Sequence, residues 1–275
     1  MPTPTITLTT DFGTTDSFVG AMKGVILSII SDVQVVDLTH EIPPQDVHAA
    51  AFTLASAYRY FPPGTIHVAV IDPDVGTRRL PLAVATGNAI FICPDNGLLS
   101  YLLAEVGVDV KCEPFIKGQV ALPSGWRAIH LSNPDYWLNP LSSTFHGRDI
   151  FAPVAAHLAT GVALASMGSP VLDIAAFAIP RPRIAPGISK GQVLHVDRFG
   201  NLITNLRVSD LPTGKLEVRI GAVTISGLAE TYQDGASLVA LIGSGGTVEI
   251  AFRNGSASRK LGITVGSEVH VTSRD

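Results

Sequence analysis

The first two thirds of the chain alternate between short apolar runs rich in β-branched residues and segments with helical periodicity. Strands favour β-branched residues, whereas apolar residues that recur every three or four positions indicate amphipathic helices. Alternating elements of this kind predict a largely parallel sheet with helices on both faces. We expect Asp46 and Asp149 to cap the helices that follow them. The predicted strands are 5–8, 33–38 and 66–71, the predicted hairpin joins 82–85 to 89–92, and the predicted helices are 18–27, 47–55, 97–106 and 149–158.

The pattern changes between residues 174 and 190, where prolines and a glycine interrupt any regular element. This composition predicts a linker or an extended strap. Beyond it, short apolar runs separated by Gly and Asn are typical of a small β-barrel or sandwich. The predicted C-terminal strands are 191–196, 216–220, 237–242, 247–252 and 268–271. The expected fold class is therefore α/β, with an N-terminal α/β sandwich-type domain at 1–175, a linker at 176–190 and a smaller C-terminal β-barrel domain at 191–275.

Composition excludes several classes of function. Of the 275 residues, 46% are hydrophobic and 15% charged, and the mean hydropathy is +0.35, which fits a large core and further burial in an oligomer. The formal charge is -4 and the basic residues are scattered, so we expect no nucleic-acid partner. Cys93 and Cys112 do not form a disulfide framework or a CxxC motif. Without a leader or an apolar stretch of about 18 residues, we expect a cytoplasmic protein that does not enter a membrane.

Two predicted strands end in charged residues. Asp11 and Asp16 follow the strand at 5–8, and Asp72 and Arg79 follow the strand at 66–71. Ligands of open α/β sheets bind outside the carboxyl ends of strands, so we expect both turns to face one crevice. A lining of carboxylates and arginine, without lysine or a glycine-rich phosphate loop, suits a cationic or polyhydroxylated small molecule better than a phosphate.

Each of these turns has two interpretations. Asp11 either holds the two hydroxyls of a ribose or simply begins a turn, and Asp16 either meets the ligand or caps the next helix. Asp72 beside Arg79 either orients a water or a cation, or forms an ion pair that stabilises the loop. An aspartate held ionised in this way is a poor general base.

Two further segments carry candidate residues. His146 precedes a glycine in an irregular stretch at 142–149, without the spacing of a zinc site. The segment 197–205 contains Asn201, whose amide can bind both edges of adenine, and Phe199, which offers a stacking face. Turns also favour Asp, Gly and Asn, so this second cue is weak by itself.

Taken together and in order, these motifs closely resemble the S-adenosylmethionine (SAM) hydroxide adenosyltransferase family, the SAM hydrolases related to fluorinase and chlorinase. The resemblance extends through nearly the whole chain. It rests on Thr10 to Gly13 with Asp16, Val36 to His40, Asp72 to Arg79, Pro94 to Gly97, Thr144 to Asp149, Asp197 to Asn205 and Glu249 to Ala257.

The resemblance implies a role for each site residue. It implies a catalytic triad of Asp72, Arg79 and His146, and a nucleophile pocket beside Phe145. The implied substrate contacts are Asp11 with the ribose diol, Asp16 and Asp197 with the ammonium, Asn201 with adenine, assisted by Phe199 and the backbone from Phe252 to Asn254, and Ser244 with the carboxylate. Where the fluorinase type offers Ser-Arg to the carboxylate, this chain has Ser244 followed by Gly245, which leaves that last contact in doubt.

The family's activity implies the reaction of SAM with water to give adenosine and L-methionine, without a metal or a cofactor. It also implies a homotrimer in which the site lies between the N-terminal domain of one subunit and the C-terminal domain of its neighbour. Halogenating relatives place Tyr or Thr at positions of Asp72 and Val75, and can carry Ser at Gly147. Because a carboxylate repels halide and accepts a hydrogen bond from water, Asp72 favours water as nucleophile. The alternatives are a halide (chloride or fluoride) adenosyltransferase, a non-catalytic adenosine- or SAM-binding protein, and a structural trimer with a vestigial site.

Overall fold

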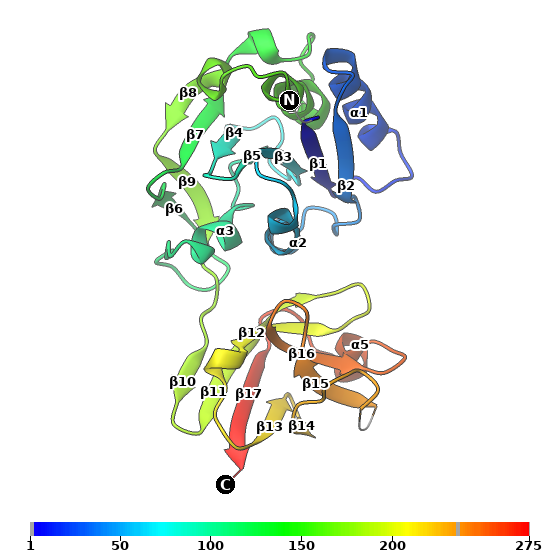
Figure 1. Ribbon diagram of the computed structural model, residues 1–275, viewed down its shortest axis with the longest axis vertical. Coiled ribbons are helices and arrows are strands. Elements are labelled where there is room, and N and C mark those ends of the chain that lie inside the picture. Colours follow the sequence, from blue (N-terminus) through cyan, green and yellow to red (C-terminus); the bar gives the residue numbers. More distant parts are fainter. Residues whose placement is uncertain (1–2, 235–236, 275) are drawn as a thin grey trace. The chain divides into compact units, whose positions relative to one another are not determined.

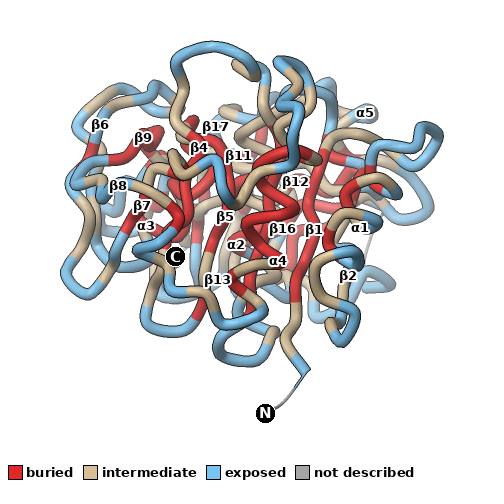
Figure 2. Tube along the Cα trace, turned by 90° about the horizontal axis from the view of Figure 1, so that it is seen from above, coloured by how far each residue is buried: buried red, intermediate tan, exposed pale blue. Residues whose placement is uncertain are grey.

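The computed structural model describes residues 3–234 and 237–274, and the chain forms two compact units, 1–179 and 180–275. Each unit has its own hydrophobic core, and Figure 2 marks the buried residues in red. Among the described residues, no helix has the length and apolar character needed to cross a bilayer.

A seven-stranded sheet in the order β2-β1-β3-β5-β4-β7-β8 forms the centre of the N-terminal unit (Figure 1). The first four strands in this order are parallel, whereas β4, β7 and β8 each run antiparallel to the preceding neighbour. The sheet is thus mixed but mainly parallel, and the hairpin predicted around 86–88 is confirmed. The strands are β1 (Thr5–Thr10), β2 (Gln34–Thr39), β3 (Thr65–Val70), β4 (Pro81–Ala85), β5 (Ala89–Pro94), β7 (Arg127–Leu131) and β8 (Gly168–Val171), with β6 (Lys117–Ala121) and β9 (Asp173–Phe177) forming a separate pair.

Helices cover both faces of this sheet. Successive side chains of a strand point to opposite faces, so Val68 and Val70 pack in the core with Met22 of α1, whereas Ala69 packs in the core with Leu54 of α2. The helices are α1 (Phe18–Ile29), α2 (Val47–Ala57), α3 (Ser100–Glu105) and α4 (Ala152–Ala159), with 3₁₀ turns η1 (Tyr58–Tyr60), η2 (Pro134–Tyr136) and η4 (Leu164–Met167), and a π-helical turn η3 (Gly147–Phe151).

The two predicted caps have different outcomes. Asp46 accepts a hydrogen bond from the Ala49 amide at 2.9 Å, which confirms it as the cap of α2. Asp149 is wrong as a cap, because its fully buried carboxylate lies inside η3 and accepts a hydrogen bond from the Ser142 amide at 2.8 Å. The helix predicted from residue 97 begins only at Ser100, because Gly97 has a φ of 104° and lies in a turn.

The C-terminal unit is an antiparallel sheet in the order β14-β13-β17-β11-β12-β16-β15, with β10 beside β11. A bridge between Ala229 and Leu241 joins the segment after β14 to β15, so the sheet is a nearly closed barrel. A short helix, α5 (Ala257–Leu261), and a 3₁₀ turn, η5 (Val208–Asp210), complete it. The strands are β10 (Arg183–Ala185), β11 (Ile188–Val196), β12 (Leu202–Arg207), β13 (Lys215–Ile220), β14 (Val223–Ser226), β15 (Leu238–Ile242), β16 (Thr247–Phe252) and β17 (Glu268–Arg274).

Two parts of this unit differ from expectation. The segment 176–190 contains the end of β9, all of β10 and the start of β11, and only 178–182 separates β9 from β10. Its prolines lie outside the paired stretches, so they shorten the strands without preventing them. The predictions also missed β12 and β14. Apolar and polar residues alternate in both, as is typical of a strand, but β12 overlaps the turn-rich segment 197–205 and β14 has only four residues.

Candidate active site

Asp72, Arg79 and His146 form one hydrogen-bonded group. Arg79 Nε donates to Asp72 Oδ1 at 2.9 Å, and Arg79 Nη2 donates to Asp72 Oδ2. The same Nη2 lies 2.7 Å from His146 Nδ1. The side chains of Asp72 and Arg79 are only 5% and 6% exposed, so solvent screens this pair weakly. The structure therefore brings together the three residues for which the sequence predicted a common site.

The arginine fixes the proton on the histidine. A guanidinium can only donate hydrogen bonds, so His146 Nδ1 must accept, and a neutral ring then carries its proton on Nε2. Burial and the charge of Arg79 lower the pKa of His146 below its ordinary value of 6.5, although the charges of Asp72 and Asp149 and a hydrogen bond to the Ser142 backbone act in the opposite direction. The guanidinium carbon also lies 5.5 Å from the ring centre of buried Phe151, which supports Arg79 from one face.

A tight turn after β3 places Asp72 and Arg79 beside each other. The strand is buried at every position and ends at Val70, and a Val75 amide bond to the Asp72 carbonyl at 3.2 Å then starts the turn. Gly76 has a φ of 77°, and a Cβ there would lie 2.6 Å from the Ser143 carbonyl oxygen. Glycine thus lets the segment before His146 approach the turn closely.

An aromatic cluster connects His146 with the end of β1. Phe145 packs edge-on against Phe12 and Phe18, at centroid distances of 5.8 and 5.2 Å. A Cβ on Gly147 would lie 3.2 Å from Phe145 and 3.3 Å from Met22, so this glycine is tightly enclosed. Because Thr10 pairs with Val70 in the parallel ladder, the turns after β1 and β3 leave the same edge of the sheet, as predicted.

The two aspartates after β1 differ in their surroundings. Asp11 is partly buried and its Oδ2 accepts a hydrogen bond from the Gln45 amide at 2.7 Å. Asp16 is exposed, and the capping position of α1 belongs to Ser17, so the interpretation of Asp16 as a helix cap is wrong. Asp11 is thus anchored by the protein, whereas Asp16 extends toward solvent.

His40 supports the turn that carries Asp11, a role that its residue type and position in the sequence did not indicate. Its Nδ1 lies 2.8 Å from Thr10 Oγ1, and its carbonyl accepts from the Gly13 amide at 2.8 Å. Its Nε2 lies 3.0 Å from Asp37 Oδ1, and Lys23 donates to the other oxygen of Asp37 at 2.6 Å. Burial opposes ionisation of Asp37, but the bonds from Lys23 and His40 outweigh it and lower the pKa of this carboxyl.

The predicted residues of the C-terminal unit form a second group around Asp197. Its carboxylate accepts hydrogen bonds from the amides of Phe199 at 2.9 Å and Asn201 at 2.8 Å, and from Asn201 Nδ2 at 3.0 Å. Asn201 is 8% exposed, so its side chain is held in place, whereas Phe199 is 76% exposed and offers an open ring face.

Glu249 and Tyr232 extend this group and were not predicted. Tyr232 Oη donates to Glu249 Oε1 at 2.8 Å, and Glu249 is 7% exposed. Burial and the charge of Asp197 raise the pKa of Glu249, although the bond from Tyr232 lowers it. Buried acids beside candidate ligand residues are recognisable only after the strands have been placed.

The remaining predicted contacts lie on exposed turns of the same unit. Ser244 is exposed in the turn between β15 and β16, which the Gly243 amide closes onto the Thr247 carbonyl at 2.9 Å. Asn254 is exposed with a φ of 59°. Phe252 is partly buried, and the Lys260 ammonium lies 5.8 Å from its ring centre.

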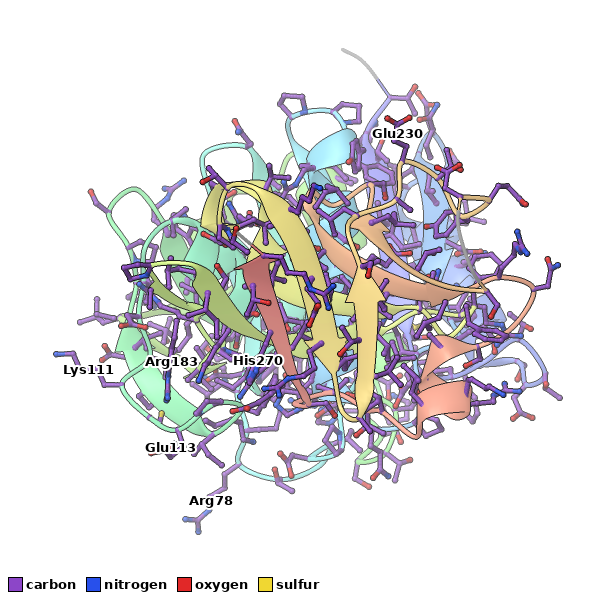
Figure 3. All side chains as sticks on the ribbon, turned by 90° about the horizontal axis from the view of Figure 1, so that it is seen from below. Arg78, Lys111, Glu113, Arg183, Glu230 and His270 are labelled. Carbon is purple, nitrogen blue, oxygen red and sulfur yellow. The ribbon has the colours of Figure 1, made fainter. Side chains whose placement is uncertain are left out.

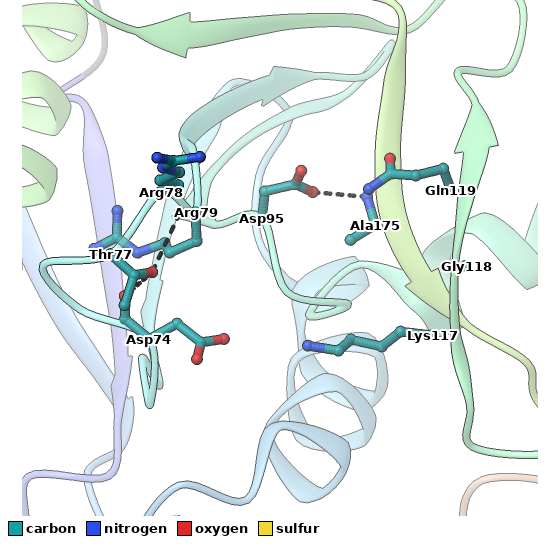
Figure 4. A pocket seen from close by; sticks show the side chains of 9 residues that line it. All are labelled: Asp74, Thr77, Arg78, Arg79, Asp95, Lys117, Gly118, Gln119 and Ala175. Atoms are coloured by element: carbon teal, nitrogen blue, oxygen red, sulfur yellow. Dashed lines mark hydrogen bonds between the residues drawn. The ribbon is translucent and has the colours of Figure 1, made fainter.

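An open hollow of about 630 Å³ adjoins the turn that carries Arg79, and Arg79 itself is one of the residues that line it. Figure 4 shows Asp74, Asp95 and Lys117 around it. Arg78 also lines it and extends outward from the fold (Figure 3). Neither Asp72 nor His146 lines this hollow, so we do not assign the reacting substrate to it.

Comparisons with known proteins give matches that cover nearly the whole chain. The models of the SAM hydroxide adenosyltransferase N-terminal and C-terminal domains match residues 6–168 and 191–270. The chain is 37% identical to the (R)-S-adenosyl-L-methionine hydrolase of Salinispora arenicola over 98% of both chains. It is 38% identical to the protein of that name from Thermus thermophilus, covering 95% of this chain and 96% of the relative.

More distant and structural relatives complete the comparison. The chain is 31% identical to the fluorinase of an Actinoplanes species, over 76% of this chain and 73% of the relative. The crystal structure of an uncharacterized conserved protein from Thermotoga maritima superposes with a TM-score of 0.83 at 32% identity, covering 98% of this chain and 100% of the other.

Proposed function

The chain belongs to the SAM hydroxide adenosyltransferase family, and we propose that it hydrolyses SAM to adenosine and L-methionine. The observation that carries this proposal is the group formed by Asp72, Arg79 and His146, in which one arginine binds both a carboxylate and an imidazole. The carboxylate can accept a hydrogen bond from a water molecule, and the imidazole N–H can donate one to it. The full-length similarity to (R)-S-adenosyl-L-methionine hydrolases supports the same activity.

The reaction needs little chemical help at the leaving group. Water attacks C5′ of the ribose as the C5′–S bond breaks, and the bonding electron pair moves to sulfur, which departs as the neutral thioether of methionine. The attacking water loses one proton, so SAM and water give adenosine, methionine and a proton. The protein therefore has to orient one water in line with the C–S bond and stabilise the positive charge that develops on its oxygen.

The geometry assigns complementary tasks to the three side chains. The Nε2–H of His146 donates to the water oxygen and leaves its other lone pair for the carbon. Asp72 accepts a water proton and stabilises the developing charge through its own negative charge. Arg79 holds both partners in place, and because it occupies His146 Nδ1, that nitrogen cannot accept the proton. Asp72 is a poor base toward free water, so it accepts the proton only as the C5′–O bond forms and the water oxygen becomes strongly acidic.

The substrate contacts in the proposal follow the family resemblance. Asp11 binds the ribose diol, and Phe145 closes the pocket of the water. The anchoring of Asp11 by the Gln45 amide supports the first assignment, since it orients the carboxylate. The remaining contacts are Asp16 and Asp197 with the ammonium, Asn201 and Phe199 with adenine alongside the backbone of Phe252 and Asn254, and Ser244 with the carboxylate. No metal or cofactor takes part.

The direct test is to incubate the purified protein with SAM and to separate the products by chromatography. Because the relatives are named for the (R) epimer, both sulfonium epimers should be assayed separately. Adenosine and methionine must appear in equal amounts, and oxygen from ¹⁸O-labelled water must appear in adenosine. Adenosine binding without methionine release over hours would support the non-catalytic alternative. 5′-Halo-5′-deoxyadenosine formed in chloride or fluoride would support the halide transferase.

We further propose that the enzyme acts as a homotrimer with each site shared by two neighbouring subunits. The support is the family resemblance together with exposed apolar residues such as Phe18, 43% exposed, and Phe199. The expected location is the cytoplasm, which the two free cysteines, Cys93 and Cys112, fit.

A further inference from the structure

We propose that Asn96 is a positioning residue that sets the distance from Asp72 and Arg79 to His146. This inference rests on the proposed hydrolysis at that site. Asn96 lies in the segment Pro94 to Gly97, to which neither the fold nor the mechanism has so far given a task.

One short segment holds both ends of the catalytic turn. Asn96 Nδ2 donates to the carbonyl of Ile71, the residue before Asp72, at 2.8 Å. The amide of the neighbouring Asp95 donates to the carbonyl of Leu80, the residue after Arg79, at 2.8 Å. The two bonds thus close the base of the turn that carries the acid and the guanidinium.

The Asn96 bond replaces a missing contact of the sheet. The parallel pairing of β3 with β5 ends at Val68 and Ile92, so Ile71 lies beyond the ladder. Ile71 is fully buried and Asn96 is 2% exposed, so water does not readily replace this bond if it is lost. The side chain of Asn96 therefore continues the sheet for the residue that leads into Asp72.

The segment around Asn96 is itself held by hydrogen bonds to strand β9. Asp95 Oδ1 accepts from the Ala175 amide of β9 at 2.7 Å, a bond drawn in Figure 4. Ser100 Oγ accepts from the Phe177 amide of the same strand at 2.8 Å. Because both anchors are in a regular strand, the segment can transmit a fixed position to the turn.

Loss of this bond should loosen Arg79 relative to His146. The charged groups that face His146 are Arg79 and Asp72 from the turn, and Asp149 from its own segment. If Arg79 moves away, its charge and its hydrogen bond to Nδ1 weaken, and His146 becomes easier to protonate. A purely structural role for Asn96 would lower stability without this change at His146.

The test compares wild type with Asn96→Leu, which removes the donor but keeps the branching and the number of side-chain heavy atoms. We expect kcat to fall about 30- to 100-fold with KM within about threefold, since a misplacement near 1 Å costs that much. We also expect His146 to titrate at a higher pH in ¹H–¹⁵N spectra of histidine-labelled protein, its signals assigned with His146→Gln. Asn133→Leu is the matched control, because Asn133 Nδ2 also donates to a carbonyl, that of Ser166, at 2.9 Å.

An unchanged titration of His146 in folded Asn96→Leu would overturn the proposal, whatever happens to kcat. So would an equal shift in Asn133→Leu. If Asn96→Leu does not fold, Asn96→Ser, whose hydroxyl is too short to reach the carbonyl, replaces it with the same expected shift. If wild type fails to hydrolyse SAM, the proposed function is wrong, and the titration still decides whether Asn96 positions the turn.

Discussion

Arg79 donates a hydrogen bond to Nδ1 of His146 over 2.7 Å while its guanidinium also binds both carboxylate oxygens of Asp72. One cation thus orients an acid and an imidazole that lie 74 positions apart in the chain (146 − 72). This relationship determines the tautomer of His146, and the first two predictions depend on it.

Asp72→Asn and His146→Ala should each lower kcat by at least about 100-fold, because each removes one of the two groups that orient the water. Binding of SAM or adenosine, measured by calorimetry, should stay within a few-fold of wild type. Arg79→Lys should lower kcat as these two variants do, since lysine cannot donate hydrogen bonds to both Asp72 and His146 in the same geometry. Wild-type turnover in both Asp72→Asn and His146→Ala would remove the proposed triad.

Turnover should be constant between pH 7 and 8 and should fall only when the pH drops below 6.5, the ordinary pKa of histidine. The reason is that burial and Arg79 lower the pKa of His146, so its neutral form persists into mildly acidic solution. The logarithm of kcat against pH measures this limb. An acid limb centred above 6.5 would contradict the lowered pKa of His146.

Gly147→Ser should not create a halide transferase while Asp72 is present. The new Cβ would lie 3.2 Å from Phe145 and 3.3 Å from Met22, so neighbours must shift, and we expect a loss of about 1–3 kcal/mol in the free energy of unfolding. Denaturant titration measures the loss, and chromatography after incubation in chloride tests for 5′-chloro-5′-deoxyadenosine. Gly20→Ser is the control, because a Cβ at Gly20 meets no atom within 4 Å.

Two variants that are inactive alone should regain activity in a mixed trimer if neighbouring subunits share a site. In a randomly mixed trimer of Asp72→Ala and Asp197→Ala chains, about a quarter of the sites combine an intact N-terminal domain with an intact C-terminal domain from the neighbour. Co-expression with two different tags and purification on both removes the trimers made of one variant alone, so the doubly purified protein should show about one third of the wild-type activity. Activity that stays at the level of the single variants would place each site within one chain.

Buried His67 should make the protein sensitive to mild acid. Burial lowers the pKa of His67 from 6.5 to about 4, and its Nδ1 is bonded to Thr7 at 2.8 Å. The unfolded chain takes up a proton near 6.5 and the folded chain only near 4, so stability is complete above 6.5 and is lost as pH falls between these values. Over this window the loss amounts to about 3 kcal/mol.

Urea unfolding at several pH values measures this effect. His67→Gln, which does not titrate, should show a shallower fall of stability than wild type between pH 6.5 and 4. Equal slopes in the two proteins would show that His67 is not the group responsible.

The sequence allowed the elements with strong local signals to be predicted. The hairpin turns at Thr86 to Asn88, where residues that favour turns separate two apolar runs, and Asp46 begins α2 as a preferred cap. Asp149 has the same residue type but became buried, because hydrogen bonds from the Ser142 amide and the Arg148 guanidinium within the same segment replace the capping bond. Local propensity cannot distinguish these two aspartates.

The candidate site was predictable only in part for a related reason. The order of the motifs led to Asp72, Arg79 and His146, but nothing in their spacing indicates that they touch. His40 and Asn96 support the site through bonds to Thr10 and to the Ile71 carbonyl. Every residue type has a main-chain carbonyl, so the sequence does not indicate which carbonyl accepts the Asn96 bond. Supporting contacts of this kind can be identified only from the structure.

The π-helical turn η3 carries one more residue than an α-helical turn of the same rise, since the Ala152 amide bonds to the carbonyl of Gly147 five residues earlier. His146 stands at the head of this widened turn, and α4 continues below it in regular form. Deleting a single residue from η3 would let the helix run straight and rotate everything above it by about 100°. The imidazole would then face away from Arg79. The extra residue of η3, rather than the composition of the preceding loop, therefore keeps the His146 ring within hydrogen-bonding distance of Arg79.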